Sequence, residues 1–452
     1  MSYANSRWPA PQTQAGEKDA LSATRHLFVS SSIEGDIQSA AYPLNPAWEA
    51  RRSVLLSICT NAPEVGHLSL SLRQWNKLLV WLDISGMALY LFEHFKCLDI
   101  HGQMPADVRK RLQQNMNDNT KRTNGMVEES VTLQREFQNA GVTYSVMKGL
   151  SLCPVAVPRA ELRHQFDLDY LVSESSALEA QRVLERRGYR LYAISGNSWE
   201  FKIGETPYVS IKDLYKDLPY RSVELHIERE DTKIGSRLAR SVRRTMFGIS
   251  MPVYSPIDLF LHQTMHIFKN VCSAHTRTAH ILEFYRHVVA RSADEAFWHT
   301  LRVETEEDLT ARFGIGLVTY LVSSALGNFA PEALTQWTVD RLPASLRLWV
   351  DLYGQQILFG DHPGNKFYLL LQKELEVAGI PPKQPVNAAL VPLGLPQFVI
   401  QRTPNETFIT TLARYLLQLR YLCSRLHFHV VEGLRYAIES RRWRQHLERL
   451  SS

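Results

Sequence analysis

Apolar side chains recur at helical spacing through residues 46–140. One example is the set Leu78, Leu79 and Leu82. A period of three to four residues is typical of helices that bury one face. Residues 107–138 are polar and proline-free, so we predict a long helix that Gly141 terminates. We therefore predict an N-terminal helical domain over residues 46–140, preceded by an irregular leader over residues 1–45, which has no sustained period.

The hydrophobic period changes after Gly141. Runs rich in β-branched and aromatic residues predict strands at 142–147, 166–172, 189–194, 208–211 and 222–227. Between them, Ser176 and Glu179 have the spacing of a capping box, which predicts a helix that ends at Gly188. Residues 141–255 are therefore predicted to form a small core of strands and helices. Helical patterns return over residues 256–452, the predicted C-terminal helical domain.

The composition is that of a soluble globular protein, with 45% hydrophobic and 21% charged residues. The formal charge of +5 is spread over 452 residues and is a weak argument for a polyanionic partner. Both a nucleotide and a nucleic acid remain compatible with it. The basic segment from Arg435 to Arg449 is more typical of a solvated terminal helix than of a surface for nucleic acid or acidic lipid.

Five scattered cysteines without a CxxC motif argue against a disulfide framework and against a cysteine-based zinc site. Residues 314–326 are apolar but are interrupted by Thr319, Ser323 and Ser324, so we expect no membrane span. Residues 1–14 lack the apolar stretch of a signal peptide. We expect a cytoplasmic protein with reduced thiols and no membrane partner.

The sequence Gln165-Phe-Asp-Leu-Asp-Tyr-Leu-Val172 contains the most informative residues of the chain, Asp167 and Asp169. Alternate residues of a strand share one face, so these carboxylates are expected about 7 Å apart on the same side of the sheet. Two anions so placed in an apolar strand repel each other unless a cation lies between them. A divalent metal ion is the simplest explanation.

A turn with phosphate-binding chemistry precedes this strand. Gly149 lets a phosphate approach the backbone, the Ser151 hydroxyl can donate to it, and Lys148 supplies positive charge. Arg163, four residues before Asp167, is a candidate contact for a triphosphate, although a surface role is equally compatible with its polar surroundings.

Glu224 lies within another strand-like run, and His226 is on the same face two residues later. A third carboxylate on an adjacent strand would complete a site for two cations and could accept the proton of an attacking hydroxyl. His262 and His266 are separated by one helical turn, and we expect them to pack or to face a substrate, since the sequence has no HExxH motif.

These residues carry a resemblance to a known family. Lys148-Gly149, the pattern Arg163-x-x-x-Asp167-x-Asp169 and Glu224-Leu-His226 resemble the uncharacterised nucleotidyltransferase family of the DNA polymerase β-like nucleotidyltransferase superfamily. Downstream, His262 and His266, followed by Arg277 and Glu283, are similar to the helical region of that family. The resemblance covers about residues 50–300.

The resemblance implies an α+β fold, in which a polymerase β-like core with a mixed sheet is flanked by N- and C-terminal helical domains. It implies transfer of a nucleoside monophosphate from an NTP, with Mg²⁺ or Mn²⁺ as cofactor and pyrophosphate as product. Asp167, Asp169 and Glu224 would hold the metal ions and would be the catalytic acids. The triphosphate would be lined by Lys148, Gly149, Ser151 and Arg163.

Two features depart from the superfamily pattern. Leu150 separates Gly149 from Ser151, where related proteins have Gly-Ser, and Glu224 replaces the more common aspartate. A noncatalytic nucleotide-binding or partner-binding module is therefore the alternative function. The expected partners are an NTP and an acceptor that is a small molecule, peptide or protein rather than RNA. Only the mild positive charge and the basic C-terminus favour RNA.

Overall fold

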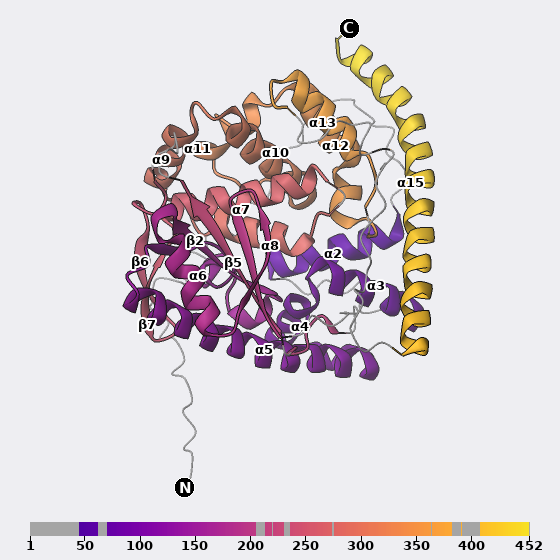
Figure 1. Ribbon diagram of the computed structural model, residues 1–452. Coiled ribbons are helices and arrows are strands. Elements are labelled where there is room, and N and C mark those ends of the chain that lie inside the picture. Colours follow the sequence, from indigo (N-terminus) through magenta and orange to yellow (C-terminus); the bar gives the residue numbers. More distant parts are fainter. Residues whose placement is uncertain are drawn as a thin grey trace. The chain divides into compact units, whose positions relative to one another are not determined.

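The computed structural model describes residues 45–61, 70–204, 213–218, 220–229, 236–273, 275–362, 364–381, 390 and 407–451. The predicted leader at residues 1–45 and the predicted strand at 208–211 lie outside the described residues, apart from Asn45, which caps the first described helix. The unit from Leu44 to Ser452 contains the helices and strands drawn in Figure 1.

Within the described part of the chain, four α-helices precede the sheet. They are α2 (Pro46–Thr60), α3 (Leu72–Ser85), α4 (Ala88–Cys97) and α5 (Ala106–Asn139). Helix α3 begins with a capping box between Ser71 and Gln74, which satisfies free amide groups of its first turn. Helix α5 is 34 residues long and is followed by Gly141 in the left-handed conformation (φ +68°), so the predicted long helix with a glycine stop is confirmed.

The sheet has seven strands in the order β3-β4-β5-β2-β1-β7-β6. The strands are β1 (Tyr144–Val146), β2 (Asp167–Ser173), β3 (Arg190–Ser195), β4 (Ser198–Ile203), β5 (Arg221–Glu228), β6 (Val242–Met246) and β7 (Ile249–Val253). The pairs β2–β5 and β1–β7 are parallel and the other neighbours are antiparallel. This mixed sheet with helical regions on either side along the chain confirms the predicted α+β fold.

The sequence-based elements need two corrections. The predicted strands do not include β4, β6 and β7, which are only five or six residues long. Strands β4 and β7 do alternate apolar and polar residues, but β6 has no such alternation and β7 contains a proline. The predicted capping box at Ser176 is wrong. Helix α6 (Ala177–Arg186) has no side-chain cap there, and the Ser176 hydroxyl instead accepts a hydrogen bond from the Thr143 amide.

Strand alternation separates the two faces of β2. Leu168, Tyr170 and Val172 pack with α5 residues in an apolar core. The Tyr170 hydroxyl lies 3.0 Å from the Ser130 hydroxyl of α5, which satisfies a buried polar group within this core. Asp167 and Asp169 consequently belong to the opposite face of the sheet.

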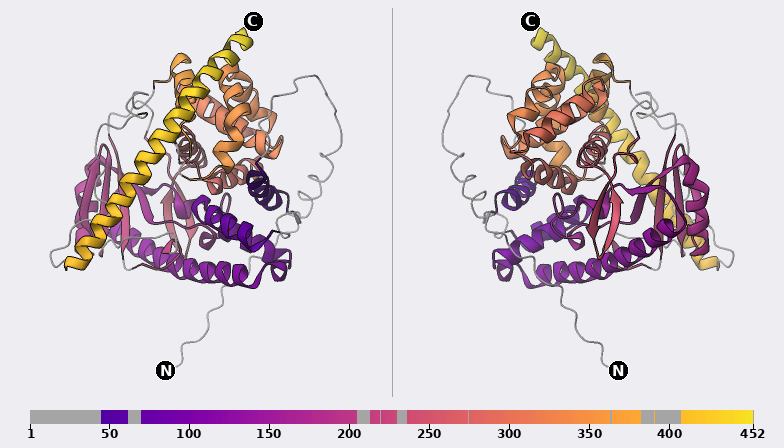
Figure 2. Two further views of the ribbon diagram at one scale, coloured as in Figure 1. Left: turned by 90° about the vertical axis from the view of Figure 1, so that its right-hand side faces the viewer. Right: turned by 90° about the vertical axis from the view of Figure 1, so that its left-hand side faces the viewer.

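Helices from the C-terminal part of the chain follow the sheet. They are α7 (Pro256–Val271), α8 (Thr278–Val289), α9 (Glu295–Thr305), α10 (Leu309–Leu326), α11 (Glu332–Thr335), α12 (Ala344–Phe359), α13 (Tyr368–Val377) and α15 (Phe408–Ser451). Figure 2 shows α15 as one long helix that crosses the other C-terminal helices.

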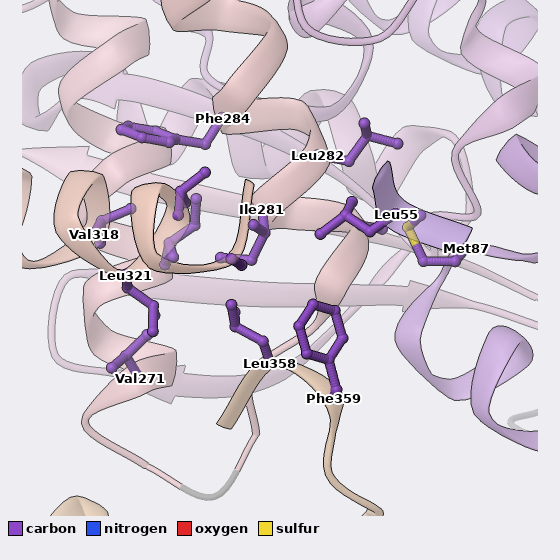
Figure 3. Close-up of a cluster of buried hydrophobic side chains, with 14 of the residues drawn as sticks. Leu55, Met87, Val271, Ile281, Leu282, Phe284, Val318, Leu321, Leu358 and Phe359 are labelled. Carbon is purple, nitrogen blue, oxygen red and sulfur yellow. The ribbon is translucent and has the colours of Figure 1, made fainter. Parts of the chain in front are cut away.

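The helices before and after the sheet share one hydrophobic core. Figure 3 shows Leu55 of α2 and Met87 beside Leu282 of α8, and Phe359 of α12 nearby. All four of these side chains are at most 2% exposed. Burial of each such side chain contributes about 1.5–3 kcal/mol, so this shared core holds α2 and the residues around Met87 against α8 and α12.

Helix α10 is long and apolar enough to cross a membrane by length and composition, contrary to the expectation from its polar interruptions. The bent pair α3–α4 passes the same criterion if the two are counted as one span. Of the apolar window of α10, 61% is buried inside the molecule, as in the core helix of a globular protein.

Candidate active site

Two carboxylates lie side by side on central strands. Parallel pairing of β2 with β5 places Asp169 directly opposite Glu224. His226, two residues after Glu224, brings its Nε2 atom within 3.5 Å of both Asp169 Oδ1 and Glu224 Oε2. Lys148 follows β1 by two residues, and its Nζ atom lies 3.1 Å from Asp169 Oδ1. The structure thus brings together Lys148, Asp169 and Glu224 of the predicted site.

The charges of this cluster stabilise one another. Burial lowers the pKa of His226, but hydrogen bonding to Asp169 and Glu224 outweighs burial and raises this pKa to about 9. The hydrogen bond from His226 lowers the pKa of Glu224 to about 2 against the effect of burial, and a hydrogen bond from the Ser198 hydroxyl acts in the same direction. Burial also opposes the charge of Lys148, but Asp169 raises its pKa overall.

Asp167 lies on the same strand face but outside this contact cluster. The cluster of possible ligand atoms within 4.8 Å of one another consists of Asp169, Glu224 and His226. Asp167 instead lines the neighbouring cavity. Burial, and then the charge of Asp169, raise the pKa of Asp167 to about 6, although Lys148 and Arg163 act in the opposite direction.

The donor set fits a divalent cation. Asp169 Oδ1 and His226 Nε2 are buried, and among the described residues they are held by the contacts of 3.1 and 3.5 Å given above, which are too long or too bent for hydrogen bonds of standard geometry. Carboxylate oxygens are preferred ligands of Mg²⁺ and Mn²⁺, whereas an imidazole nitrogen is preferred by softer metals. His226 therefore fits better as a partner that orients the two carboxylates than as a Mg²⁺ ligand.

A cavity of about 350 Å³ opens beside the acids, between the sheet and helices α7 and α8. Its polar lining contains three cationic side chains, three carboxylates and five histidines. They are Lys148, Arg163, Arg277, Asp167, Asp169, Glu283, His164, His262, His266, His275 and His280. The cationic side chains can bind an anionic ligand, and the histidines can form hydrogen bonds with a ligand.

The predicted triphosphate residue Arg163 has a protein partner. Its Nε atom lies 3.1 Å from Glu283 Oε1, and Nη1 donates to Gln165 Oε1 at 3.3 Å. Glu283 is 1% exposed and also accepts a hydrogen bond from the Tyr90 hydroxyl. Arg163 thus lines the cavity but neutralises a buried carboxylate.

Gly149 and Ser151 are placed differently from Lys148. Neither belongs to the described residues that line the cavity. Ser151 is 1% exposed, and its hydroxyl has no hydrogen-bond partner among the described residues. Gly149 has a φ of +67°, a left-handed conformation that glycine adopts without strain.

Replacement of Gly149 by alanine should reduce stability more than the same change at Gly141. Both residues have nearly equal φ angles, +67° and +68°, so both variants should lose about 1–2 kcal/mol from backbone strain. Only at Gly149 would the new Cβ lie 2.7 Å from Gln165 Oε1, so this amide would have to shift and lose its hydrogen bond from Arg163 Nη1, whereas nothing lies within 4 Å at Gly141. Chemical denaturation should therefore give the lower unfolding free energy for Gly149→Ala, and equal values would contradict this packing.

Arg277 and the histidines of α7 and α8 were not among the predicted site residues, although the chemistry of His262 and His266 suggested a substrate-facing role. Arg277 precedes α8, and within the described part of the chain its guanidinium has no ion-pair or hydrogen-bond partner. Burial, and then Lys148, lower the pKa of His262 to about 3, and burial lowers that of His266 to about 4. Both imidazoles are consequently neutral hydrogen-bonding groups near pH 7.

Comparison with known families matches residues 71–326 to the model of a family described as uncharacterised nucleotidyltransferase. The match covers more than half of the chain, and the protein belongs to this family. The matched range includes the whole seven-stranded sheet and helices α7 and α8, and so contains the site described above.

Other comparisons add little. The curated proteins contain no match. Among solved structures, an antigenic nucleotidyltransferase-like protein from Paracoccidioides brasiliensis is similar over 48% of this chain and 94% of its own, with 11% identity and a TM-score of 0.26. A similarity of this size bears on neither fold nor function.

Proposed function

We propose that the protein transfers a nucleoside monophosphate from an NTP to a hydroxyl or amine acceptor and releases pyrophosphate, in a reaction that depends on a divalent metal. One observation carries the proposal. The carboxylates of Asp169 and Glu224 lie beside each other on β2 and β5, next to a cavity rich in cationic and imidazole groups. Family membership supports the same class of reaction.

Asp167, Asp169 and Glu224 are the proposed holders of Mg²⁺ or Mn²⁺. When bound, the metal would stabilise the negative charge that develops on the oxygens around the α-phosphorus. His226 and the Ser198 hydroxyl hold the carboxylate of Glu224 in position. Asp169 is fixed in turn by contacts with His226 and Lys148.

The nitrogen groups of the cavity are the proposed ligands of the NTP. Lys148 lies between the acids and the cavity and can donate to a phosphate oxygen. Arg277 offers a guanidinium with no partner among the described residues, which can pair with two phosphate oxygens. Neutral His262 and His266 can bind the acceptor or the nucleoside, and we propose that α7 and α8 form the wall of the acceptor pocket.

Arg277→Gln should weaken NTP binding by about ten- to a hundredfold, since one charge-assisted hydrogen bond is worth roughly 1.5–3 kcal/mol. The melting temperature should not change, because the guanidinium has no partner in the described structure. Isothermal titration calorimetry with NTP and Mg²⁺ measures the affinity. Arg302→Gln, at an exposed position of α9, is the matched control and should bind as the unchanged protein does.

The acceptor can be sought directly. Incubation with each NTP, Mg²⁺ or Mn²⁺ and cell extract, followed by mass spectrometry, should reveal a molecule with the added mass of one NMP. We expect a small molecule, a peptide or a protein rather than RNA. Absence of an NMP adduct with every NTP and with both metals would count against the proposed reaction.

The burial of Ser151 favours a second candidate, a noncatalytic nucleotide-binding module. Its hydroxyl does not line the cavity, so a phosphate contact expected from the superfamily pattern is missing in the described structure. Such a module would bind NTP in the presence of metal without releasing pyrophosphate. Calorimetry together with a pyrophosphate assay over a broad acceptor panel distinguishes the two functions.

A further inference from the structure

The 44-residue helix α15 buries several polar side chains along with Tyr436 and Trp443, and it exposes many of its apolar side chains. A helix of this length extends about 66 Å. In a globular protein the apolar face of a surface helix normally points to the core. The exposure of these apolar side chains indicates that the outer face of α15 has a partner.

The inner face of α15 is attached to the protein largely through polar groups. The buried residues on this face are Arg414, Gln418, Glu432, Tyr436, Glu439 and Trp443. Glu439 accepts a hydrogen bond from the Tyr353 hydroxyl at 3.0 Å, and the Trp443 indole donates to Glu374 at 2.9 Å. Tyr436 and Trp443 belong to the main hydrophobic core, so they define which face is inward.

The outer face is a nearly continuous apolar stripe. It consists of Ile409, Leu412, Leu416, Leu419, Leu426, Val430, Leu434 and Ile438, which are separated by three, four or seven residues. Each is at least 49% exposed, and Leu426 and Leu434 are 67% and 63% exposed. Residues at this spacing lie on one side of a helix and can be buried together.

The charges of this outer surface are almost entirely positive. Glu432 and Glu439 are buried on the inner face, where they pair with Arg435 at 2.6 Å and Arg442 at 3.3 Å. Glu448 is the exposed acid among the described residues of the helix. The exposed arginines of the helix are Arg420, Arg435, Arg441, Arg442, Arg444 and Arg449. An apolar stripe flanked by six exposed arginines and one exposed acid is complementary to an anionic, apolar surface.

We propose that α15 binds the surface of a membrane that contains acidic lipids, with its apolar stripe in the headgroup region and its arginines against lipid phosphates. A second copy of the chain is a poorer occupant, because the outer face of its α15 offers these six arginines one exposed carboxylate, that of Glu448, among the described residues. The proposal replaces our expectation of a protein without a membrane partner, and it is independent of the nucleotidyltransferase activity.

Vesicle flotation of the full-length protein tests the proposal. We expect binding to vesicles of three parts phosphatidylcholine to one part phosphatidylglycerol, weaker binding at high salt, and little binding to phosphatidylcholine alone. The double variant Leu416→Glu/Leu426→Glu should bind the acidic vesicles at least about tenfold more weakly, because it places charge in the apolar stripe.

The matched control is Leu178→Glu/Val377→Glu, which changes two residues that are 61% and 85% exposed on α6 and α13. This variant should bind as the unchanged protein does, and circular dichroism should show that both variants are folded. Failure of the unchanged protein to bind acidic vesicles, or equal binding by both variants, would overturn the proposal. A dimer in sedimentation velocity that only the α15 variant disrupts, without vesicle binding, would instead identify a second copy as the partner.

Discussion

Asp169→Asn should reduce NMP transfer by on the order of a thousandfold, the size of effect expected when one group that stabilises transition-state charge is removed. Asp169 lies opposite Glu224 and contacts both Lys148 and His226, so the variant loses a proposed metal ligand and the centre of the charge cluster. Turnover of NTP with Mg²⁺ and the identified acceptor measures the loss. Activity within a few-fold of the unchanged protein would show that Asp169 is not catalytic.

Asp83→Asn is the matched control for this variant. Asp83 is also a buried aspartate, 1% exposed, and it is paired with Arg111 and hydrogen-bonded to Tyr215 away from the described cavity lining. Its substitution should lower the melting temperature, because the buried pair with Arg111 is lost, without changing the metal dependence of NTP binding. A common loss of activity in both variants would therefore indicate instability rather than a catalytic role.

Arg163→Met should reduce the free energy of unfolding by about 3 kcal/mol, because it leaves the buried Glu283 carboxylate without its cation. The Arg163 side chain is 18% exposed and that of Glu283 is 2% exposed, so solvent provides little compensation. Chemical denaturation measures this effect. Arg182→Met, which removes an exposed ion pair with Glu179 on α6, is the control and should change stability by less than about 1 kcal/mol.

The double variant Arg163→Met/Glu283→Leu separates a structural role of Arg163 from triphosphate binding. Removal of both charges avoids an unpaired buried carboxylate, so most of the lost stability should return. If Arg163 mainly neutralises Glu283, the double variant should also retain NTP affinity. Loss of affinity in a stable double variant would assign the triphosphate contact to Arg163.

Local patterns predicted those parts of the fold that are governed by local chemistry. Strand alternation placed Asp167 and Asp169 on one face, and the long polar run before Gly141 predicted α5. The strand that contains Glu224 was also identified from its alternation, and the structure pairs it with β2. These features depend on residues that are close in sequence.

Contacts between distant residues could not be predicted in this way. Arg163 and Glu283 are separated by 120 positions, so no local sequence pattern indicates that they form an ion pair. Arg277, in contrast, has no partner among the described residues. This could not be predicted from the sequence either, because it depends on how α8 packs beside the sheet. The core shared by α2, α8 and α12 likewise depends on tertiary packing.

The most direct test of the proposed NMP transfer follows an isotope label placed at either the α- or the γ-phosphorus of the NTP. With acceptor-containing extract and Mg²⁺, label at the α-phosphorus should appear on the acceptor, and label at the γ-phosphorus should appear in pyrophosphate, with both signals absent for Asp169→Asn. Transfer of the γ-label to the acceptor would identify a phosphotransferase instead. Release of neither label in the presence of metal-dependent NTP binding would contradict the proposed enzyme and favour the noncatalytic module.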